Sequence, residues 1–311
     1  MLLSIALIIL GLAALVAGGE FLLKGAVAIA RKFNISALVI GMTIVAFGTS
    51  APELIVSIKS AYQGHAEIAI GNVVGSNIAN LALVLGITCI IFPMVVSRNT
   101  KVLDFPKMMY ATTLFLLFAY DGIIERWEGG ILLASLIIFI IYIIRDSVKN
   151  EHIPNELEPE RPTSIAFLYL LIGMVGLYFG AEWLLVGAID LAREAGMSEH
   201  VIGITIIAFG TSVPELATSC VAAVKKETDI SIGNLIGSNI FNISAVIGIT
   251  SILEPMSIQN NLYNFDVYWL VGIPLLLFAM MWKNKIGRLS GSLLFMVYVT
   301  YIGLTVMEFS H

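Results

Sequence analysis

The sequence predicts an all-α polytopic membrane protein with ten transmembrane helices, built as two inverted five-helix repeats. The chain of 311 residues is 58% hydrophobic and only 13% charged, whereas about a quarter of the residues of soluble proteins are charged. Apolar runs long enough to cross a hydrocarbon core, which takes about 20 helical residues, recur along the whole chain. The second part of the chain also repeats the first at a constant offset of 162 residues.

Ten spans follow from the apolar runs and the polar segments between them. They are placed at residues 2–29, 37–62, 68–92, 103–120, 129–148, 164–192, 200–224, 230–254, 265–282 and 289–307. The first run, MLLSIALIIL, lacks the basic start of a cleavable signal peptide, so it is expected to remain as the first span. Of the 17 basic residues, 13 fall on the side opposite to the termini. Basic residues favour the cytoplasmic side, so both termini are predicted to lie outside the cytoplasm.

The polar segment NEHIPNELEPERPT divides the chain into two halves. We expect a first repeat at residues 1–149, a cytoplasmic linker at 150–163 and a second repeat at 164–311. Three prolines and four glutamates in the linker do not favour a packed core. A solvated hinge explains its acidity, and a regulatory cation site is the alternative.

Two polar blocks recur in both halves. VIGMTIVAFGTSAPELIVS at 39–57 returns as VIGITIIAFGTSVPELATS at 201–219 with 14 of 19 residues identical, and the block at 70–88 returns at 232–250 with 12 of 19 identical. Because five spans, an odd number, separate equivalent residues, the second copy must cross the membrane in the opposite direction. This inverted arrangement is found in many secondary transporters.

The polar residues of both blocks fall near the middle of their spans. Pro52 cannot donate a backbone hydrogen bond, so the second helix is expected to break around residues 48–50, and Pro214 has the same effect in the seventh. Broken helices 2 and 7 would then leave carbonyl oxygens for a ligand at the midplane. The side-chain oxygen donors expected there are Glu53, Glu215, Asn80, Asn242, Thr49, Thr211, Ser50, Ser212, Ser76 and Ser238.

A capping box is the structural alternative, because Ser50 with Glu53 and Ser212 with Glu215 both fit the pattern S-x-x-E. A charged group at the bilayer centre costs at least about 2.5–3.5 kcal/mol, whereas a cap contributes about 1 kcal/mol. Capping alone therefore does not explain the acids. Oxygen donors with two carboxylates, and no histidine or thiol nearby, suit Ca²⁺ or Na⁺ better than zinc or copper.

The segments GTSAPE with GSNIAN, and GTSVPE with GSNIFN, resemble the two alpha repeats of the sodium/calcium exchangers in the cation/calcium antiporter superfamily. The resemblance covers nearly the whole chain. The short linker lacks the large regulatory domain of animal exchangers, so the likeness is to compact prokaryotic members of the cell membrane. It implies exchange of Na⁺ for Ca²⁺ by alternating access at one shared midplane site.

The resemblance also implies roles for individual residues. Glu53 and Glu215 would be the main Ca²⁺ ligands, together with the carbonyl oxygens of Thr49 and Thr211. The Na⁺ sites would use the carbonyl oxygens of Ala46 and Ala208 with Ser50, Ser76, Ser212 and Ser238, and Asn80 and Asn242 would line the central position. Some relatives carry Asp at position 242 and potassium-dependent ones use an added acid, so asparagine at both places does not favour potassium coupling.

In the family, the first and sixth spans slide across the other eight, and glycines in them would permit smooth contact. These glycines are Gly18, Gly19, Gly25, Gly173, Gly176, Gly180 and Gly187. Glu20 and Glu182 occupy equivalent places in the same two spans. For them we expect a helix-end or packing role, with ion access as the alternative.

Several other functions remain open. Protons could replace Na⁺ as the coupling ion, since Glu53 and Glu215 are ionisable, and another divalent cation could replace Ca²⁺. An intramembrane enzyme and a passive cation channel are the remote alternatives, and no H-E-x-x-H motif or serine nucleophile elbow supports an enzyme. The expected partners are Ca²⁺, Na⁺ and the lipid bilayer. No cofactor, nucleic acid or obligatory protein partner is expected, and Cys89 and Cys220 are interpreted as small buried apolar residues.

Overall fold

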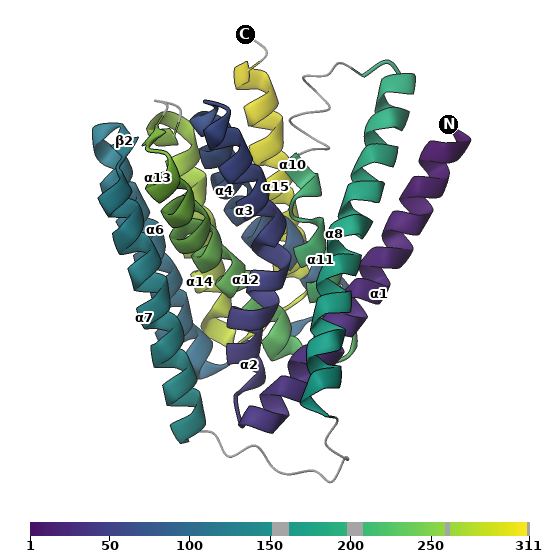
Figure 1. The fold of residues 1–311 in the computed structure, drawn as a ribbon, viewed down its shortest axis with the longest axis vertical. Coiled ribbons are helices and arrows are strands. Elements are labelled where there is room, and N and C mark those ends of the chain that lie inside the picture. Colours follow the sequence, from purple (N-terminus) through teal and green to yellow (C-terminus); the bar gives the residue numbers. More distant parts are fainter. Residues whose placement is uncertain (151–161, 198–207, 259–261, 310–311) are drawn as a thin grey trace.

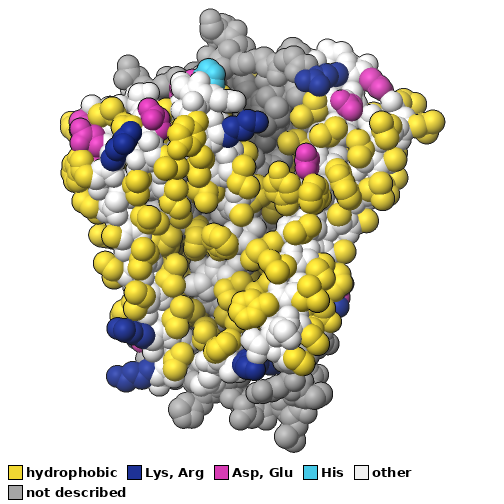
Figure 2. Space-filling view, viewed as in Figure 1, with side chains coloured by type: hydrophobic (Ala, Val, Ile, Leu, Met, Phe, Trp, Pro, Cys, Tyr) yellow, Lys and Arg dark blue, Asp and Glu magenta, His cyan; other side chains and the backbone are white. Residues whose placement is uncertain are grey.

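The structure is a computed structural model that describes residues 1–150, 162–197, 208–258 and 262–309. Within these ranges nine helices are long and apolar enough to cross a membrane, and they match nine of the predicted spans. The predicted seventh span lies partly outside the described residues, and its described part contains the apolar helix Val213–Val224. Apolar side chains cover the flank of the molecule, and charged ones lie mostly toward its two ends (Figure 2). The predicted class, an all-α polytopic membrane protein, is confirmed.

The five spans of the first half are each built from one or more helical segments. In chain order they are α1 (Leu2–Phe33); α2 (Ala37–Ile40), η1 (Gly41–Val45) and α3 (Ala46–Tyr62); α4 (Ala66–Ala79), η2 (Asn80–Val84) and α5 (Leu85–Ile91); η3 (Thr100–Asp104), α6 (Phe105–Phe118) and η4 (Ala119–Asp121); and α7 (Arg126–Asn150). Strand β1 (Met94–Val95) follows the third span and β2 (Ile123–Ile124) follows the fourth.

The second half repeats this order. Its segments are α8 (Thr163–Glu194); α10 (Ala208–Gly210) and α11 (Val213–Val224); α12 (Thr228–Phe241), η6 (Asn242–Ile247) and α13 (Gly248–Leu253); η7 (Leu262–Asp266), α14 (Val267–Met280) and η8 (Met281–Lys283); and α15 (Arg288–Phe309). Strand β3 (Met256–Ser257) precedes the ninth span and β4 (Lys285–Ile286) precedes the tenth.

The two halves run through the molecule in opposite directions (Figure 1). Helix α1 runs from the N-terminus toward the end of the molecule at which α7 finishes, whereas its repeat α8 runs back from that end. Helix α15 finishes at the same end as the N-terminus. The inverted five-helix arrangement predicted from the odd number of intervening spans is therefore observed.

Short strands join the two halves. Strand β1 pairs antiparallel with β4, and β2 pairs antiparallel with β3. Because β3 repeats β1 and β4 repeats β2, each half supplies one strand to each pair. The sequence did not predict these strands, since two residues are too few to show an alternating pattern.

Glycine contacts also cross between the halves. A Cβ atom on Gly86 of α5 would lie 3.0 Å from the carbonyl oxygen of Gly291 in α15, and one on Gly129 of α7 would lie 2.6 Å from that of Gly248 in α13. Small residues allow helix backbones to approach this closely. The fifth span of each half therefore packs directly on the third span of the other, which interlocks the two halves.

Helices α1 and α8 form a close antiparallel pair. A Cβ atom on Gly18 would lie 2.7 Å from the Leu177 nitrogen, and one on Gly173 would lie 2.5 Å from the Leu22 nitrogen. The glycines of these two spans were expected to smooth the contact with the other eight. Instead, most of these glycines lie where α1 and α8 contact each other. Gly19 faces α11, and a Cβ atom on Gly19 would lie 3.5 Å from the Ala217 carbonyl oxygen.

The two proline-containing spans differ from each other. In the seventh, the helix is interrupted between α10 and α11, where Ser212 has φ −89° and ψ 3°. In the second, α3 continues through Pro52, and the helix departs from α geometry earlier, in the π-helical turn η1. The break expected at residues 48–50 is therefore absent. Within this helix the Thr49 hydroxyl donates to the carbonyl oxygen of Ala46 at 3.3 Å.

Candidate cation-binding site

Two carboxylates from opposite halves lie in the interior, Glu53 on α3 and Glu215 on α11. Both residues are 0% exposed, and they are close enough for their charges to interact. Burying two like charges is unfavourable unless a cation or other groups compensate them. The predicted convergence of the two halves on one pair of acids is present in the structure.

Hydroxyl groups surround both carboxylates. Ser50 Oγ donates to Glu215 Oε1 at 3.3 Å, so this contact crosses between the halves. Thr49 and Ser238 also adjoin the Glu215 carboxylate, and Ser76 adjoins that of Glu53. Four of the six hydroxyls that the sequence predicted as ligands are thus next to the acids: those of Thr49, Ser50, Ser76 and Ser238.

Threonine contacts repeat around the site. Thr49 Oγ1 lies 3.2 Å from Asn234 Oδ1 and 3.3 Å from Ser238 Oγ, both on α12. Its repeat, Thr211 Oγ1, lies 3.3 Å from Ser76 Oγ on α4. Each threonine therefore joins its own half to the third span of the opposite half.

Several buried oxygen atoms at this site have no hydrogen-bond donor among the described residues. They are both carboxylate oxygens of Glu53, Oε2 of Glu215, Oδ1 of Asn80 and of Asn242, and Oγ of Ser212. Buried polar atoms nearly always have a partner. Unpartnered acceptors gathered around two acids are the pattern that a cation substrate would satisfy.

The capping-box alternative does not describe this geometry. Ser212 holds the N-cap position of α11 by its backbone, but its side chain makes no capping hydrogen bond. Ser50 lies inside α3, and its hydroxyl is bonded to Glu215 of the other half. The acids are therefore not explained by capping of their own helices.

The remaining predicted residues lie at the edges of the site. Ala46 is buried at the start of α3, and Thr211 is half-buried at the interruption before α11. Ala208 begins α10, and only its backbone is described.

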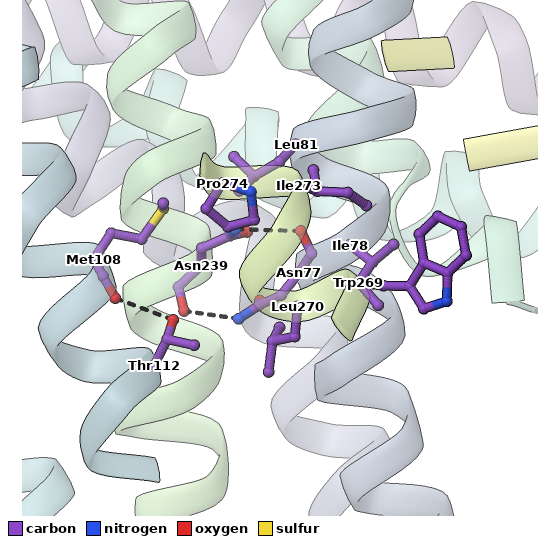
Figure 3. A pocket seen from close by; sticks show the side chains of 10 residues that line it. All are labelled: Asn77, Ile78, Leu81, Met108, Thr112, Asn239, Trp269, Leu270, Ile273 and Pro274. Carbon is purple, nitrogen blue, oxygen red and sulfur yellow. Dashed lines mark hydrogen bonds between the residues drawn. The ribbon is translucent and has the colours of Figure 1, made fainter. Parts of the chain in front are cut away.

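Sequence reasoning missed a pair of asparagines beside Asn80 and Asn242. Asn77 and Asn239 exchange bonds across the two halves, since the Nδ2 atom of each donates to the other's backbone carbonyl oxygen at 3.2 Å (Figure 3). They also line a cavity of about 10 Å³ between α4, α6, α12 and α14, which is about the volume of one water probe. The constant offset of the repeat could have identified them, because both belong to the G-S-N triplet of the second block.

A second missed group lies one turn before the serines. Asn72 Nδ2 donates to the Glu53 carbonyl oxygen at 3.2 Å and to Ser57 Oγ at 3.0 Å. In the other half, Asn234 Nδ2 donates to Ser219 Oγ at 3.2 Å. These amides anchor the acid-bearing helices to α4 and α12, and the conserved spacing within the repeat was again the available signal.

Helices α12 and α4, which both contribute to the site, differ in how fully they are buried. Residues 230–240 of α12 are all buried, and α12 packs on α2, η1 and α3. On α4, the repeat of α12, Gly71 is exposed and Asn72 is half-buried. Among the described residues, α12 is therefore more fully covered than the first turns of α4, and residues 199–207, which repeat α2 and η1, are not described.

The donor set favours exchangeable hard cations. Within the described ranges, no group of three or more histidine, cysteine, aspartate or glutamate residues is placed to hold a metal ion. The site has two carboxylates and otherwise neutral oxygen atoms. Oxygen ligands of this kind suit Ca²⁺ and Na⁺, and a site of modest charge can release its ion.

Glu20 and Glu182 differ although they are repeats of each other. Glu20 Oε1 lies 3.2 Å from Lys24 Nζ and 2.5 Å from Lys225 Nζ, which links α1 to the end of α11. The positions that repeat Lys24 and Lys225 are Val186 and Gln63, and Glu182 is exposed. Glu20 therefore has an electrostatic packing role that its repeat cannot share.

Comparison with known proteins gives a consistent result. The sequence profile of the family described as "Sodium/calcium exchanger protein" matches residues 3–145 and 165–307. The chain is 38% identical to "Putative antiporter CaxA" of Alkalimonas amylolytica, over 97% of this chain and 98% of that protein. It is 30% identical to "Sodium/calcium exchanger MaX1" of Methanosarcina acetivorans, over 95% of this chain and 96% of the relative.

A solved structure of the sodium-calcium exchanger NCX_Mj superposes on this fold with a TM-score of 0.84 and 33% sequence identity, covering 97% of this chain and 98% of that one. A structure of the same exchanger soaked without Na⁺ and Ca²⁺ gives 0.85, with 97% and 99% covered. The profile matches both repeats, and the relatives align from end to end. The chain therefore belongs to the sodium/calcium exchanger family of multi-pass membrane transporters, and it is not an enzyme.

Proposed function

We propose that this protein is an antiporter that exchanges Na⁺ for Ca²⁺ at the site between α3 and α11. The observation that carries the proposal is the pair Glu53 and Glu215, which come from opposite halves and are fully buried. Three of their four carboxylate oxygens have no donor among the described residues. The family of the chain, and the relative named a sodium/calcium exchanger, support both ions as substrates.

The proposed ligand roles follow the arrangement of the oxygens. Glu53 and Glu215 would hold Ca²⁺ with the carbonyl oxygens of Thr49 and Thr211. Na⁺ would use the same acids with the remaining oxygens: the carbonyls of Ala46 and Ala208 and the hydroxyls of Ser50, Ser76, Ser212 and Ser238. Asn80 and Asn242 would line the centre.

Two ionised carboxylates give the site a charge of about −2, which one Ca²⁺ or two Na⁺ would neutralise. Because both ions would need the same acids, they would occupy the site in turn. Exchange would then require that the site face one side at a time, which the inverted repeat makes possible by exchanging the surroundings of its two halves.

We also propose the plasma membrane of a prokaryotic cell as the location, with both termini outside the cytoplasm. The prokaryotic relatives support the membrane, and the excess of Lys and Arg on the side opposite to the termini supports the orientation.

Flux in liposomes tests the coupling ion. Purified protein is reconstituted, the membrane potential and pH are clamped, and Ca²⁺ uptake is followed while Na⁺, H⁺ and K⁺ gradients are imposed one at a time. Uptake driven by an outward Na⁺ gradient is expected. Uptake driven only by a proton gradient would replace Na⁺ with H⁺ as the coupling ion, and uptake that neither saturates nor needs a counter-ion would identify a channel.

A further inference from the structure

Four asparagines form a closed group where the two halves meet, and two of them have no assigned role. Besides the mutual bonds of Asn77 and Asn239, the Nδ2 atom of Asn80 donates to Asn239 Oδ1, and that of Asn242 donates to Asn77 Oδ1, both at 3.1 Å. All four residues are at most 3% exposed. Each bond in one half has a matching bond of equal length in the other.

This bonding fixes which way each amide points. A backbone carbonyl oxygen can only accept, so the nitrogen of Asn77 must face Asn239, and Asn77 Oδ1 is left to accept. Asn242 must therefore present its nitrogen to Asn77, which turns its own Oδ1 away from the group. The same argument applied to Asn239 orients Asn80. Both oxygens that are turned away are buried and have no donor among the described residues.

The ligand asparagines also lie against the acid-bearing helices of the opposite half. Segment η6, which begins at Asn242, contacts α3 with Glu53, and η2, which begins at Asn80, contacts α11 with Glu215. Both segments are π-helical turns, a distortion often found at functional sites. The asparagine group and the acids thus lie on neighbouring helices.

We propose that Asn77 and Asn239 are positioning residues, each of which holds the amide of the ligand asparagine in the other half so that its oxygen faces the cation. Asn77 acts on Asn242, and Asn239 acts on Asn80. The inference rests on the proposed function of the site. It adds a cross-half connection by which both ligand oxygens are oriented together.

Equilibrium Ca²⁺ binding to the purified full-length protein tests this role. Asn77→Leu removes the acceptor of the Asn242 amide without adding a charge. Without that acceptor, the buried Nδ2 donor of Asn242 is unpaired and the Asn242 amide can rotate by half a turn. The affinity for Ca²⁺ is therefore expected to fall about tenfold. Asn239→Leu should give the same loss, and Thr112→Val is the control, because Thr112 lines the same cavity but bonds only the Met108 carbonyl oxygen.

A double-mutant cycle separates positioning from general packing. If Asn77 acts through Asn242, Asn77→Leu should weaken binding no further in an Asn242→Ala background, while the effects of Asn77→Leu and Asn80→Ala should multiply. Multiplicative losses in both backgrounds would overturn the inference. If Asn77→Leu does not fold, Asn77→Ser carries the same cycle with a shorter polar side chain.

Glu53→Gln separates this inference from the proposed function. Loss of Ca²⁺ binding in Glu53→Gln together with normal binding in Asn77→Leu would overturn the positioning role and leave the site assignment standing. Normal binding in Glu53→Gln would remove the site assignment, and the positioning role with it.

Discussion

Helices α4 and α12 have nearly the same sequence but different surroundings. Both carry an I-G-N-x-x-G-S-N segment. On α12 this segment is buried under α2 and η1, and a Cβ atom on Gly233 would lie 2.5 Å from the Leu38 carbonyl oxygen. On α4 no described residue comes within 4 Å of a Cβ atom on Gly71.

Within the described part of the chain, the two helices therefore differ in their contacts more than in their sequences. The four asparagines make matching bonds in both halves, whereas the described residues cover α12 and not α4. Residues 199–207, which repeat α2 and η1, lie outside the described residues. Under the proposed alternating access, the counterpart arrangement would have α4 covered in place of α12.

The two buried glutamates at the site are predicted to give the largest effect. Glu53→Gln and Glu215→Gln should each lower Ca²⁺ exchange by about a hundredfold or more, because each removes a charged ligand that no neighbouring group replaces. Flux in liposomes measures this, with the exposed Glu182→Gln as control. Near-normal exchange in either variant would remove the assignment of these glutamates as the ligands of the ion.

Alanine at the paired glycines should give an intermediate effect that differs between the halves. Gly233→Ala places a methyl group against the Leu38 backbone, which should destabilise the present arrangement by about 1–3 kcal/mol. Gly71→Ala meets no described residue within 4 Å and should affect only an arrangement in which α4 is covered. Both variants are expected to exchange ions more slowly.

Hydrogen exchange of the backbone amides distinguishes the two glycine variants. Gly233→Ala should lose protection in α12 and gain it in α4, while Gly71→Ala should keep the wild-type pattern. Full exchange activity in Gly71→Ala would argue against a state in which α4 is covered, and so against alternation of the two halves.

The ion pairs of Glu20 predict the smallest effect. The side chains of Glu20 and Lys225 are 39% and 43% exposed, so their pair should contribute at most about 1 kcal/mol. Lys225→Gln should therefore change the exchange rate by no more than about fivefold. Gln63→Lys places a cation at the position that repeats Lys225, and it tests whether a pair with Glu182 changes the exchange rate in the opposite direction. Equal and unchanged rates in both variants would leave Glu20 with a packing role alone.

Much of the fold was readable from the sequence because it depends on long apolar runs and an exact repeat offset. The spans, the inverted threading and the meeting of Glu53 with Glu215 all follow from those two signals. The continuity of α3 did not, because Pro52 is only a local signal and a membrane helix can continue through a proline when its surroundings satisfy the freed backbone group.

The contacts between the two halves could not be predicted from the sequence alone. Asn77 and Asn239 look like any small polar residues of a membrane helix, and their exchange of bonds appears only once α4 and α12 lie side by side. The glycines of α1 and α8 were predicted to permit smooth contact with the other eight spans, but the repeat does not say which neighbour they face. The ligand roles of the central oxygens remain predictions that the flux and binding experiments address.

The exchanged strands place a condition on how this architecture could arise. Strands β1 and β2 find their partners only in the oppositely threaded half. A single five-span protein with the same strands could form these pairs only as a dimer whose two subunits were inserted in opposite orientations. Gene duplication would then have converted a balance between two insertion directions into one chain of fixed topology.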